Sequence, residues 1–181
     1  MTPPTEGEPC PTPLAASEVL REFRVESDAW SIEHNGATIR GRTIGRGTPL
    51  ILLNGIGGTH ELYALFAWLL RDEFRCVLFD YPDDPGRRTV GDFASDLFAV
   101  ASAQAGDRFA MYATSFGSLV ALQAMLRSPK RTSRAILQGG FAHRGLSHAE
   151  RILVRVGRFL PGEVDRLPLR AAVQANNHRP W

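Results

Sequence analysis

The six residues YATSFG, Tyr112 to Gly117, join an apolar run to a helical pattern. The run FAMYA at 109–113 is continuously apolar, and apolar residues recur at helical spacing after Ser115 until Pro129. A serine at a sharp strand-to-helix turn needs small residues two places before and after it, because the two backbones approach closely there. Gly117 meets this need, and Ala113 meets it with one additional methyl group. The stretch therefore predicts either an exposed nucleophile, Ser115, or a structural serine at a helix N-terminus.

The fold class follows from three more apolar runs, LILL at 50–53, CVLF at 76–79 and AIL at 135–137. Runs without alternation are typical of central parallel strands that are covered on both faces. Helical patterns separate them, and a hairpin signal, Asn35-Gly36 between alternating residues, precedes them. We therefore expect an α/β fold with a mainly parallel sheet and an N-terminal antiparallel hairpin.

A second glycine-rich stretch, LILLNGIGGTHE at 50–61, ends a predicted strand and opens a helix. One interpretation is a dinucleotide-binding turn with Gly55, Gly57 and a ribose-binding Asp80, although His60 stands where the third glycine belongs. The other is a loop whose backbone N–H joins that of Phe116 in stabilising the oxyanion of acyl transfer. Both glycine-containing turns follow parallel strands and so emerge at one edge of the sheet. The second interpretation explains both turns.

Composition narrows the classes of function. The chain has 181 residues, 44% hydrophobic and 22% charged, with a net charge of +2, as expected for one globular domain. Basic residues are not interleaved with aromatic ones, so nucleic-acid binding is not expected. Cys10 and Cys76 form neither a disulfide framework nor a metal motif, so we expect no metal or cofactor and a buried thiol at Cys76. No pattern specifies an oligomeric state.

The Pro-rich start, MTPPTEGEPCPTP, has neither the basic nor the apolar region of a signal peptide. The longest apolar stretch, residues 62–70, is too short to span a bilayer. The sequence therefore predicts a soluble, cytoplasmic protein without a membrane span.

In the order of its elements the sequence resembles the α/β-hydrolase fold family over about residues 28–181. The shared order is a hairpin, a strand with a glycine-rich loop, a strand ending in Asp-Tyr-Pro at 80–82, and the serine turn. The resemblance implies that Ser115 is the nucleophile and that the backbone N–H groups of Phe116 and Ile56 form an oxyanion hole. It implies supporting roles around the turn and the loop for Ala113, Gly117, Asn54 and Gly55. It also divides the chain into a flexible Pro-rich tail and lead-in (1–27), a partial core (28–145) and the start of a helical cap (146–181).

Three features depart from the family pattern. Asn54 stands where the family's loop usually begins with histidine, and Ala113 replaces the usual glycine. The family's acid and histidine follow its seventh and eighth strands, whereas Trp181 falls within the expected cap. Because a serine hydroxyl needs a base to become a good nucleophile, we expect an incomplete chain whose base and acid lie in further sequence.

The histidines and acids already present are expected to have other roles. His60, at the start of the first helix, is a candidate for lining a substrate pocket. Solvated or structural roles are expected for His34, His143, His148 and His178. The acids that follow the run at 76–79, Asp80, Asp83 and Asp84, are expected to be solvated.

The preferred prediction is a serine hydrolase acting on an ester or related acyl bond of a small molecule. An apolar group in that substrate is inferred from Phe159 and Leu160, which share one side of the predicted cap helix. Two alternatives stay open. One is a non-catalytic binding or adaptor protein of the same fold, favoured by the truncated triad and by Asn54 and Ala113, and the other is the dinucleotide-binding enzyme.

Overall fold

The computed structural model describes residues 15–55, 58–82, 88–140 and 148 of the chain. The chain divides into two compact units, Met1–Ala142 and His143–Trp181, and the fold below is that of the first unit. Apart from His148, the expected cap at 146–181 lies outside the described residues, as does the Pro-rich start at 1–14.

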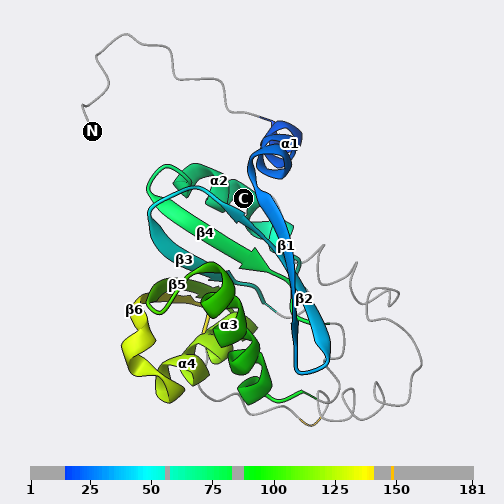
Figure 1. The fold of residues 1–181 in the computed structure, drawn as a ribbon. Coiled ribbons are helices and arrows are strands. Elements are labelled where there is room, and N and C mark those ends of the chain that lie inside the picture. The colour runs from blue at the N-terminus through cyan, green and yellow to red at the C-terminus, as the bar shows by residue number, and fades with distance from the viewer. Residues whose placement is uncertain (1–14, 56–57, 83–87, 141–147, 149–181) are drawn as a thin grey trace. The chain divides into compact units, whose positions relative to one another are not determined.

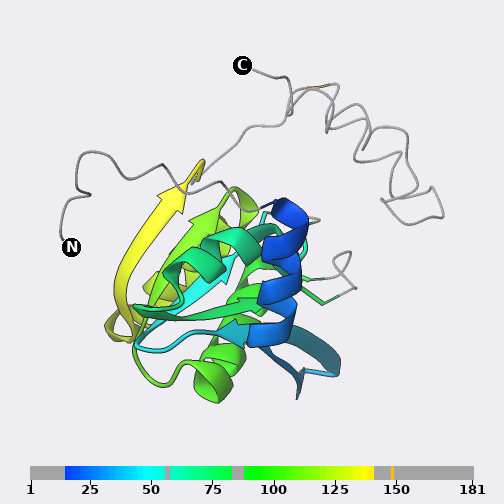
Figure 2. The same ribbon diagram turned by 90° about the horizontal axis from the view of Figure 1, so that it is seen from above.

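One mixed sheet forms the centre of this unit (Figure 1). Its strands are β1 (Asp28–His34), β2 (Ala37–Ile44), β3 (Thr48–Leu53), β4 (Phe74–Phe79), β5 (Phe109–Thr114) and β6 (Thr132–Gln138). They are arranged in the order β1-β2-β4-β3-β5-β6. β1 and β2 pair antiparallel, β2 pairs antiparallel with β4, and the remaining neighbours are parallel. The hairpin and β6 lie at opposite edges (Figure 2). The predicted α/β fold with an N-terminal hairpin is confirmed.

Helices cover both faces of the sheet (Figures 1 and 2). The helical elements are α1 (Ala16–Glu26), η1 (His60–Tyr63), α2 (Ala64–Leu70), α3 (Val90–Gln104), α4 (Phe116–Arg127) and η3 (Pro129–Arg131). On β3, Ile51 and Leu53 pack in a cluster with α3 and α4, whereas Leu50 and Leu52 pack in a second cluster with α1 and α2. Successive side chains of a strand point to opposite faces, so two covered faces require the continuous apolar runs seen in the sequence.

The β1–β2 turn has the two-residue form that its sequence predicts. Asn35 has φ of 49° and Gly36 has φ of 77°. Positive φ at both central residues matches the right-handed twist of the flanking strands, and it is why Asn-Gly is favoured there. The hairpin prediction is confirmed.

The strand predicted around Ala135–Leu137 exists as β6, but its environment differs from the expectation. Ala135 and Ile136 are exposed, and Ile136 keeps 64% of its surface. Among the described residues β6 pairs with β5 alone. In the described part of the chain, this apolar run therefore has a strand neighbour on one side only. A continuous apolar run predicts a central, covered strand, whereas a strand at the edge of the sheet can leave such residues exposed.

Helix α1 falls within the segment that the sequence was expected to leave as a flexible lead-in. Phe23 is fully buried and Val19 is 4% exposed, and Phe23 packs in the cluster formed with α2. Arg24 also forms a bidentate ion pair with Glu61 of η1, with Nε to Oε1 at 2.8 Å and Nη2 to Oε2 at 3.0 Å. The helix is short and the prolines before it dominate the local composition, which is why pattern reading missed it.

We predict that Phe23→Ala loosens α1 and lowers the free energy of unfolding by about 4 kcal/mol, because it removes a fully buried ring. Val25→Ala is the matched control on the same helix, where the side chain is 79% exposed, and it should change stability by less than about 0.5 kcal/mol. Urea denaturation of both variants measures the difference. Equal losses would show that α1 does not depend on the core contact.

The start of α3 is held by a capping box and by a buried ion pair. The Asp92 N–H donates to Thr89 Oγ1 at 3.3 Å, and the Asp92 carboxylate accepts from the Thr89 N–H at 2.7 Å, as the Thr-x-x-Asp pattern predicts.

Arg88 donates to the carboxylate of Asp96, whose side chain is fully buried. Burial raises the pKa of Asp96, and the Arg88 guanidinium opposes that rise.

Replacing the arginine should expose the cost of that buried carboxylate. We expect Arg88→Met to lower the free energy of unfolding by about 3 kcal/mol near neutral pH, since it leaves the Asp96 charge without a partner. Burial raises the folded-state pKa of Asp96 above its unfolded value, so the fold favours the protonated form and the loss should shrink as the pH falls. Urea denaturation over a pH series measures this. Arg88→Met combined with Asp96→Leu should recover most of the stability at neutral pH, and a loss independent of pH would contradict the explanation.

Candidate active site

Ser115 lies between β5 and α4 in a backbone conformation that is rare for a residue with a side chain. Its φ is 49° and its ψ is −116°, and its side chain is exposed. Such a conformation costs free energy, so it persists only where the surroundings impose it. The Ser115 N–H donates to the Gln138 carbonyl at 3.0 Å, and the Ser115 carbonyl accepts from the Ser118 N–H at 3.0 Å. Hydrogen bonds thus hold the two peptide groups that flank Ser115.

Gly117 explains why this turn can be so tight. A Cβ at Gly117 would stand 2.5 Å from the Leu53 carbonyl oxygen and 2.7 Å from that of Asn54. Those carbonyls end β3, so the first turn of α4 rests directly on the end of the neighbouring strand. Only a residue without a side chain permits this approach.

Ala113, the other small residue of the turn, is fully buried in the cluster with α3 and α4. Its carbonyl accepts a hydrogen bond from Ser118 Oγ at 3.1 Å. The structure therefore accommodates the methyl group that replaces the family's usual glycine.

We predict that Gly117→Ala lowers the free energy of unfolding by about 3 kcal/mol, since the added methyl group overlaps two backbone carbonyls. Gly106→Ala serves as the control: a Cβ there meets nothing within 4 Å and only its φ of +84° is unfavourable, so about 1 kcal/mol is expected. Urea midpoints of the two variants give the comparison. Similar losses at both positions would mean that α4 can move away from β3.

The glycine-rich loop after β3 lies beside the serine. Gly55 is so placed that a Cβ on it would be 3.5 Å from Ser115 Cβ and 3.9 Å from Ser115 Oγ. The Gly58 N–H donates to the Gly55 carbonyl at 3.2 Å, which closes a turn. Ile56, the expected oxyanion donor of this loop, lies outside the described residues.

Phe116, the other expected donor, is the first residue of α4. The first N–H groups of a helix have no partner within the helix, and the helix dipole adds a partial positive charge there. A backbone N–H free to bind an anion therefore follows Ser115 directly.

Two tyrosines hold the end of β3. The Tyr63 hydroxyl donates to the Leu53 carbonyl at 3.3 Å and contacts Thr114 Oγ1 at 2.6 Å. The Tyr81 hydroxyl donates to the Asn54 carbonyl at 3.2 Å. Burial raises the pKa of both tyrosines, so both hydroxyls keep their protons at neutral pH. Asn54 itself is 2% exposed, and its Nδ2 is buried without a hydrogen-bond partner.

His60 and Asp80 form a pair at the same edge of the sheet. Asp80 Oδ1 accepts from the His60 N–H at 2.7 Å, and Asp80 Oδ2 lies 2.8 Å from His60 Nδ1. The expectation that Asp80 is simply solvated is therefore wrong, because a hydrogen-bonding partner 20 residues away in sequence occupies both of its oxygens. Asp83 and Asp84 lie outside the described residues.

The topology also bears on the dinucleotide alternative. Numbered along the chain, the four parallel strands lie in the order 2-1-3-4, whereas the dinucleotide-binding fold begins with the order 3-2-1-4. Asp80, the required ribose-binding acid, is engaged by His60. Both observations disfavour that alternative.

The same order marks where a ligand can enter. The helix after β3 covers one face and the helix after β5 covers the other, so the two connections diverge between these neighbouring strands. In open α/β sheets, ligands bind at such a switch point, beyond the carboxyl ends of the strands. Gly55 follows β3 and Ser115 follows β5, so both lie at this point.

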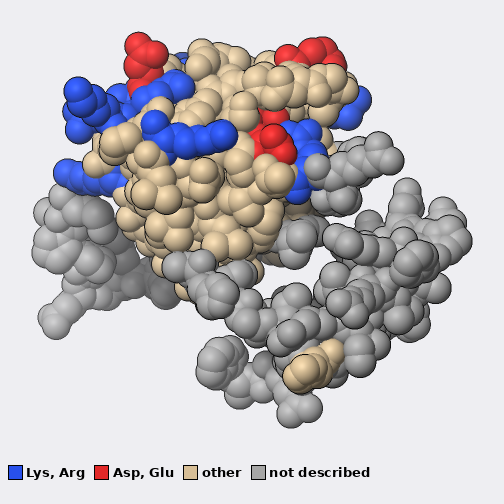
Figure 3. Space-filling view, turned by 90° about the horizontal axis from the view of Figure 1, so that it is seen from below, with Lys and Arg blue, Asp and Glu red and all other residues tan. Residues whose placement is uncertain are grey.

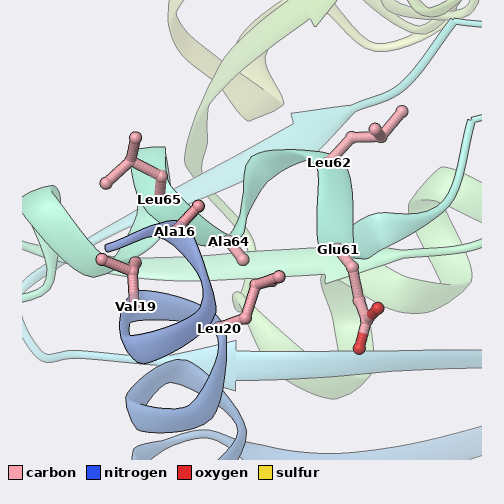
Figure 4. Close-up of a pocket in the computed structure, with 7 residues that line it drawn as sticks. All are labelled: Ala16, Val19, Leu20, Glu61, Leu62, Ala64 and Leu65. Atoms are coloured by element: carbon pink, nitrogen blue, oxygen red, sulfur yellow. The ribbon is translucent and has the colours of Figure 1, made fainter. Parts of the chain in front are cut away.

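A separate surface pocket of about 310 Å³ lies between α1 and the η1–α2 segment (Figure 4). It is lined by Ala16, Val19, Leu20, Glu61, Leu62, Ala64 and Leu65. None of the predicted site residues lines it. We therefore do not place the substrate there.

The structure can be compared with the expectations of no metal site, no membrane span and no nucleic-acid-binding surface only where it describes the chain. Within the described residues, no three His, Cys, Asp or Glu side chains come together in a way that could hold a metal ion. None of the helices in that part of the chain has the length and apolar composition of a membrane span. On the face shown in Figure 3, basic and acidic side chains lie among one another, and the rest of the visible surface is largely uncharged.

The general base expected for Ser115 stays a prediction. In the part of the chain that the structure describes, no hydrogen bond ends on Ser115 Oγ. His34 is half-buried beside Ser95 Oγ at 3.1 Å, and His60 is paired with Asp80. His143 and His178 lie outside the described residues, and His148 is exposed.

Comparison with known proteins decides the family. The model of the alpha/beta hydrolase family matches residues 50–180, which is more than half of the chain. The chain belongs to the α/β-hydrolase family. The resemblance found in its sequence is thereby confirmed, together with its fold.

The relatives of this α/β-hydrolase chain include several hydrolases. It is 26% identical over 106 residues to the "Putative carbamate hydrolase RutD" of Agrobacterium fabrum. The matched region covers 55% of this chain and 41% of the relative. Among solved structures it is similar to a "putative epoxide hydrolase" from Pseudomonas aeruginosa (TM-score 0.56, 22% identity, 61% of this chain and 40% of that one). It is also similar to carboxylesterase CesB from Bacillus subtilis (TM-score 0.58, 20% identity, 67% of this chain and 46% of that one).

The extent of these matches limits what they transfer. The chain spans about two fifths of the length of the curated relative that it matches. At 20–22% identity the structural matches establish a common fold, and they do not transfer the substrate of either neighbour to this chain.

The sequence did not identify Tyr63 or Tyr81 as residues of this site, and it did not indicate that Asp80 pairs with His60. The signal for Tyr81 and Asp80 was their position directly after the run at 76–79, which places them at the edge where Ser115 lies. No spacing rule in the sequence indicates their partners.

Proposed function

We propose that this protein is a serine hydrolase in which Ser115 Oγ attacks the carbonyl carbon of an ester or related acyl bond. The observation that carries the proposal is the backbone of Ser115, with φ of 49° and ψ of −116° directly between a strand and a helix. An exposed serine in a strained strand-to-helix turn supports a nucleophile, because strained backbone conformations cluster at active sites.

In the proposed reaction a bond forms between Ser115 Oγ and the acyl carbon, and the Oγ proton passes to a general base outside the described residues. The carbonyl oxygen becomes an oxyanion, which the backbone N–H groups of Phe116 and Ile56 would stabilise. Collapse of this intermediate expels the alcohol, which takes up the proton, and leaves an acyl group on Ser115. Water then attacks the acyl carbon and gives a proton to the base. The bond between the acyl carbon and Ser115 Oγ breaks, Oγ takes the proton back from the base, and the carboxylic acid is released.

The substrate class is inferred from two sources. The curated relative is named as a putative carbamate hydrolase, and that name denotes hydrolysis of an acyl–heteroatom bond. The apolar face predicted for the segment after Ser147 supports a small substrate with an apolar group. We propose no metal and no organic cofactor, since a serine nucleophile, a general base and an oxyanion hole suffice for this reaction.

The proposal predicts covalent labelling of Ser115 by a fluorophosphonate, which reacts with activated serines. Labelling of the full-length native protein should be lost in Ser115→Ala, because the proposed nucleophile is removed. Ser102→Ala, at an exposed serine on α3, should label like the unaltered protein. Intact-protein mass spectrometry measures the adduct.

A folded full-length protein that stays unlabelled would contradict catalysis and support the alternative, a non-catalytic binding protein of this fold. Labelling that persists in Ser115→Ala would assign the nucleophile to another residue.

A further inference from the structure

The two residues that directly follow β4 contact both ends of the glycine-rich loop. Tyr81 donates its hydroxyl to the carbonyl of Asn54, where the loop begins, at 3.2 Å. Asp80 accepts from the backbone N–H of His60, where the loop ends, at 2.7 Å, and also contacts His60 Nδ1 at 2.8 Å. One dipeptide thus bridges the loop from start to finish.

This loop needs an external support. Three of its residues are glycine, at positions 55, 57 and 58, and glycine leaves the backbone more conformations than any other residue. Oxyanion stabilisation depends on donors that are already in place before charge develops. A loop that reorganised during the reaction would lose much of that effect.

The bridge is also continuous with the serine turn. The Tyr81 ring packs edge to face on Phe116, with ring centroids 5.5 Å apart, and on Phe93 at 5.2 Å. Phe116 supplies the other expected oxyanion N–H. The Asn54 carbonyl that Tyr81 binds is one of the two against which Gly117 rests. Tyr81 therefore contacts the loop on one side of Ser115 and the helix start on the other.

We propose that Asp80 and Tyr81 are positioning residues that hold the two ends of the glycine-rich loop, His60 and Asn54, in place relative to Ser115. Neither residue touches the reacting atoms. Asp80 holds the end of the loop through His60, and Tyr81 holds its beginning through Asn54. The inference rests on the proposed hydrolase function, since it assigns these residues to the oxyanion site of that reaction.

The test compares Tyr81→Phe and Asp80→Ala in the full-length native protein, with p-nitrophenyl butyrate as the substrate. Each variant should lower kcat about tenfold, less than the loss of a direct oxyanion donor, and leave KM within about twofold, because only transition-state stabilisation is affected. The rate of fluorophosphonate labelling should fall in parallel. Rates are expressed per labelled Ser115, so that partial unfolding does not count as a loss of kcat.

Ser95→Ala is the matched control. It removes a hydroxyl that lies 3.1 Å from His34 Nε2 and leaves the loop contacts intact, so kcat should stay within about twofold. The double variant should lose less than the product of the two single effects, because both contacts restrain one loop.

Unaltered protein that labels at Ser115 while Tyr81→Phe keeps the full kcat would overturn this inference and leave the hydrolase proposal standing. Unaltered protein that neither labels nor hydrolyses the ester would instead overturn the hydrolase proposal, and this inference with it. A rise in KM at constant kcat would also contradict a positioning role.

Discussion

The contact between the start of α4 and the end of β3 is the constraint on which the rest of the structure depends. Because Gly117 has no side chain, its Cα can rest against the carbonyls of Leu53 and Asn54. The close approach forces the chain at Ser115 into its positive-φ turn and places Gly55 so that a Cβ on it would be 3.5 Å from Ser115 Cβ. A methyl group at Gly117 would separate the two backbones and remove the reason for the turn.

Strain at Ser115, on the order of 1–3 kcal/mol for such a conformation, has identifiable compensation. The peptide groups on both sides of the serine are hydrogen-bonded, to Gln138 and to Ser118. The strands beneath it carry apolar side chains into two separate clusters, so β3 and β5 cannot shift without disturbing both faces. The site is thus a local distortion supported by the well-packed centre of the sheet.

The arrangement of strands and the arrangement of site residues have one cause. Connections from β3 and β5 go to opposite faces, so they diverge beyond the carboxyl ends of these two neighbours. β4 lies on the other side of β3, so Asp80 and Tyr81 reach the glycine-rich loop from that side. The loop is therefore flanked by the serine on one side and by two hydrogen-bonding side chains on the other. Family membership agrees with this organisation, and the chemistry follows from what the loop and the serine turn can hold.

The sequence by itself determined the elements and their class. Continuous apolar runs report two covered faces, Asn35-Gly36 reports a type of turn, and small residues around Ser115 report a close approach, because each property belongs to a few consecutive residues. Tertiary structure alone decided the pairing of His60 with Asp80 and of Tyr81 with Asn54, partners 20 and 27 residues apart. It also decided that Phe23 is buried in a segment read as a lead-in, and that Ile136 in an apolar run is exposed. Local periodicity records which face of an element is apolar, whereas the partner that a side chain meets depends on which strands become neighbours.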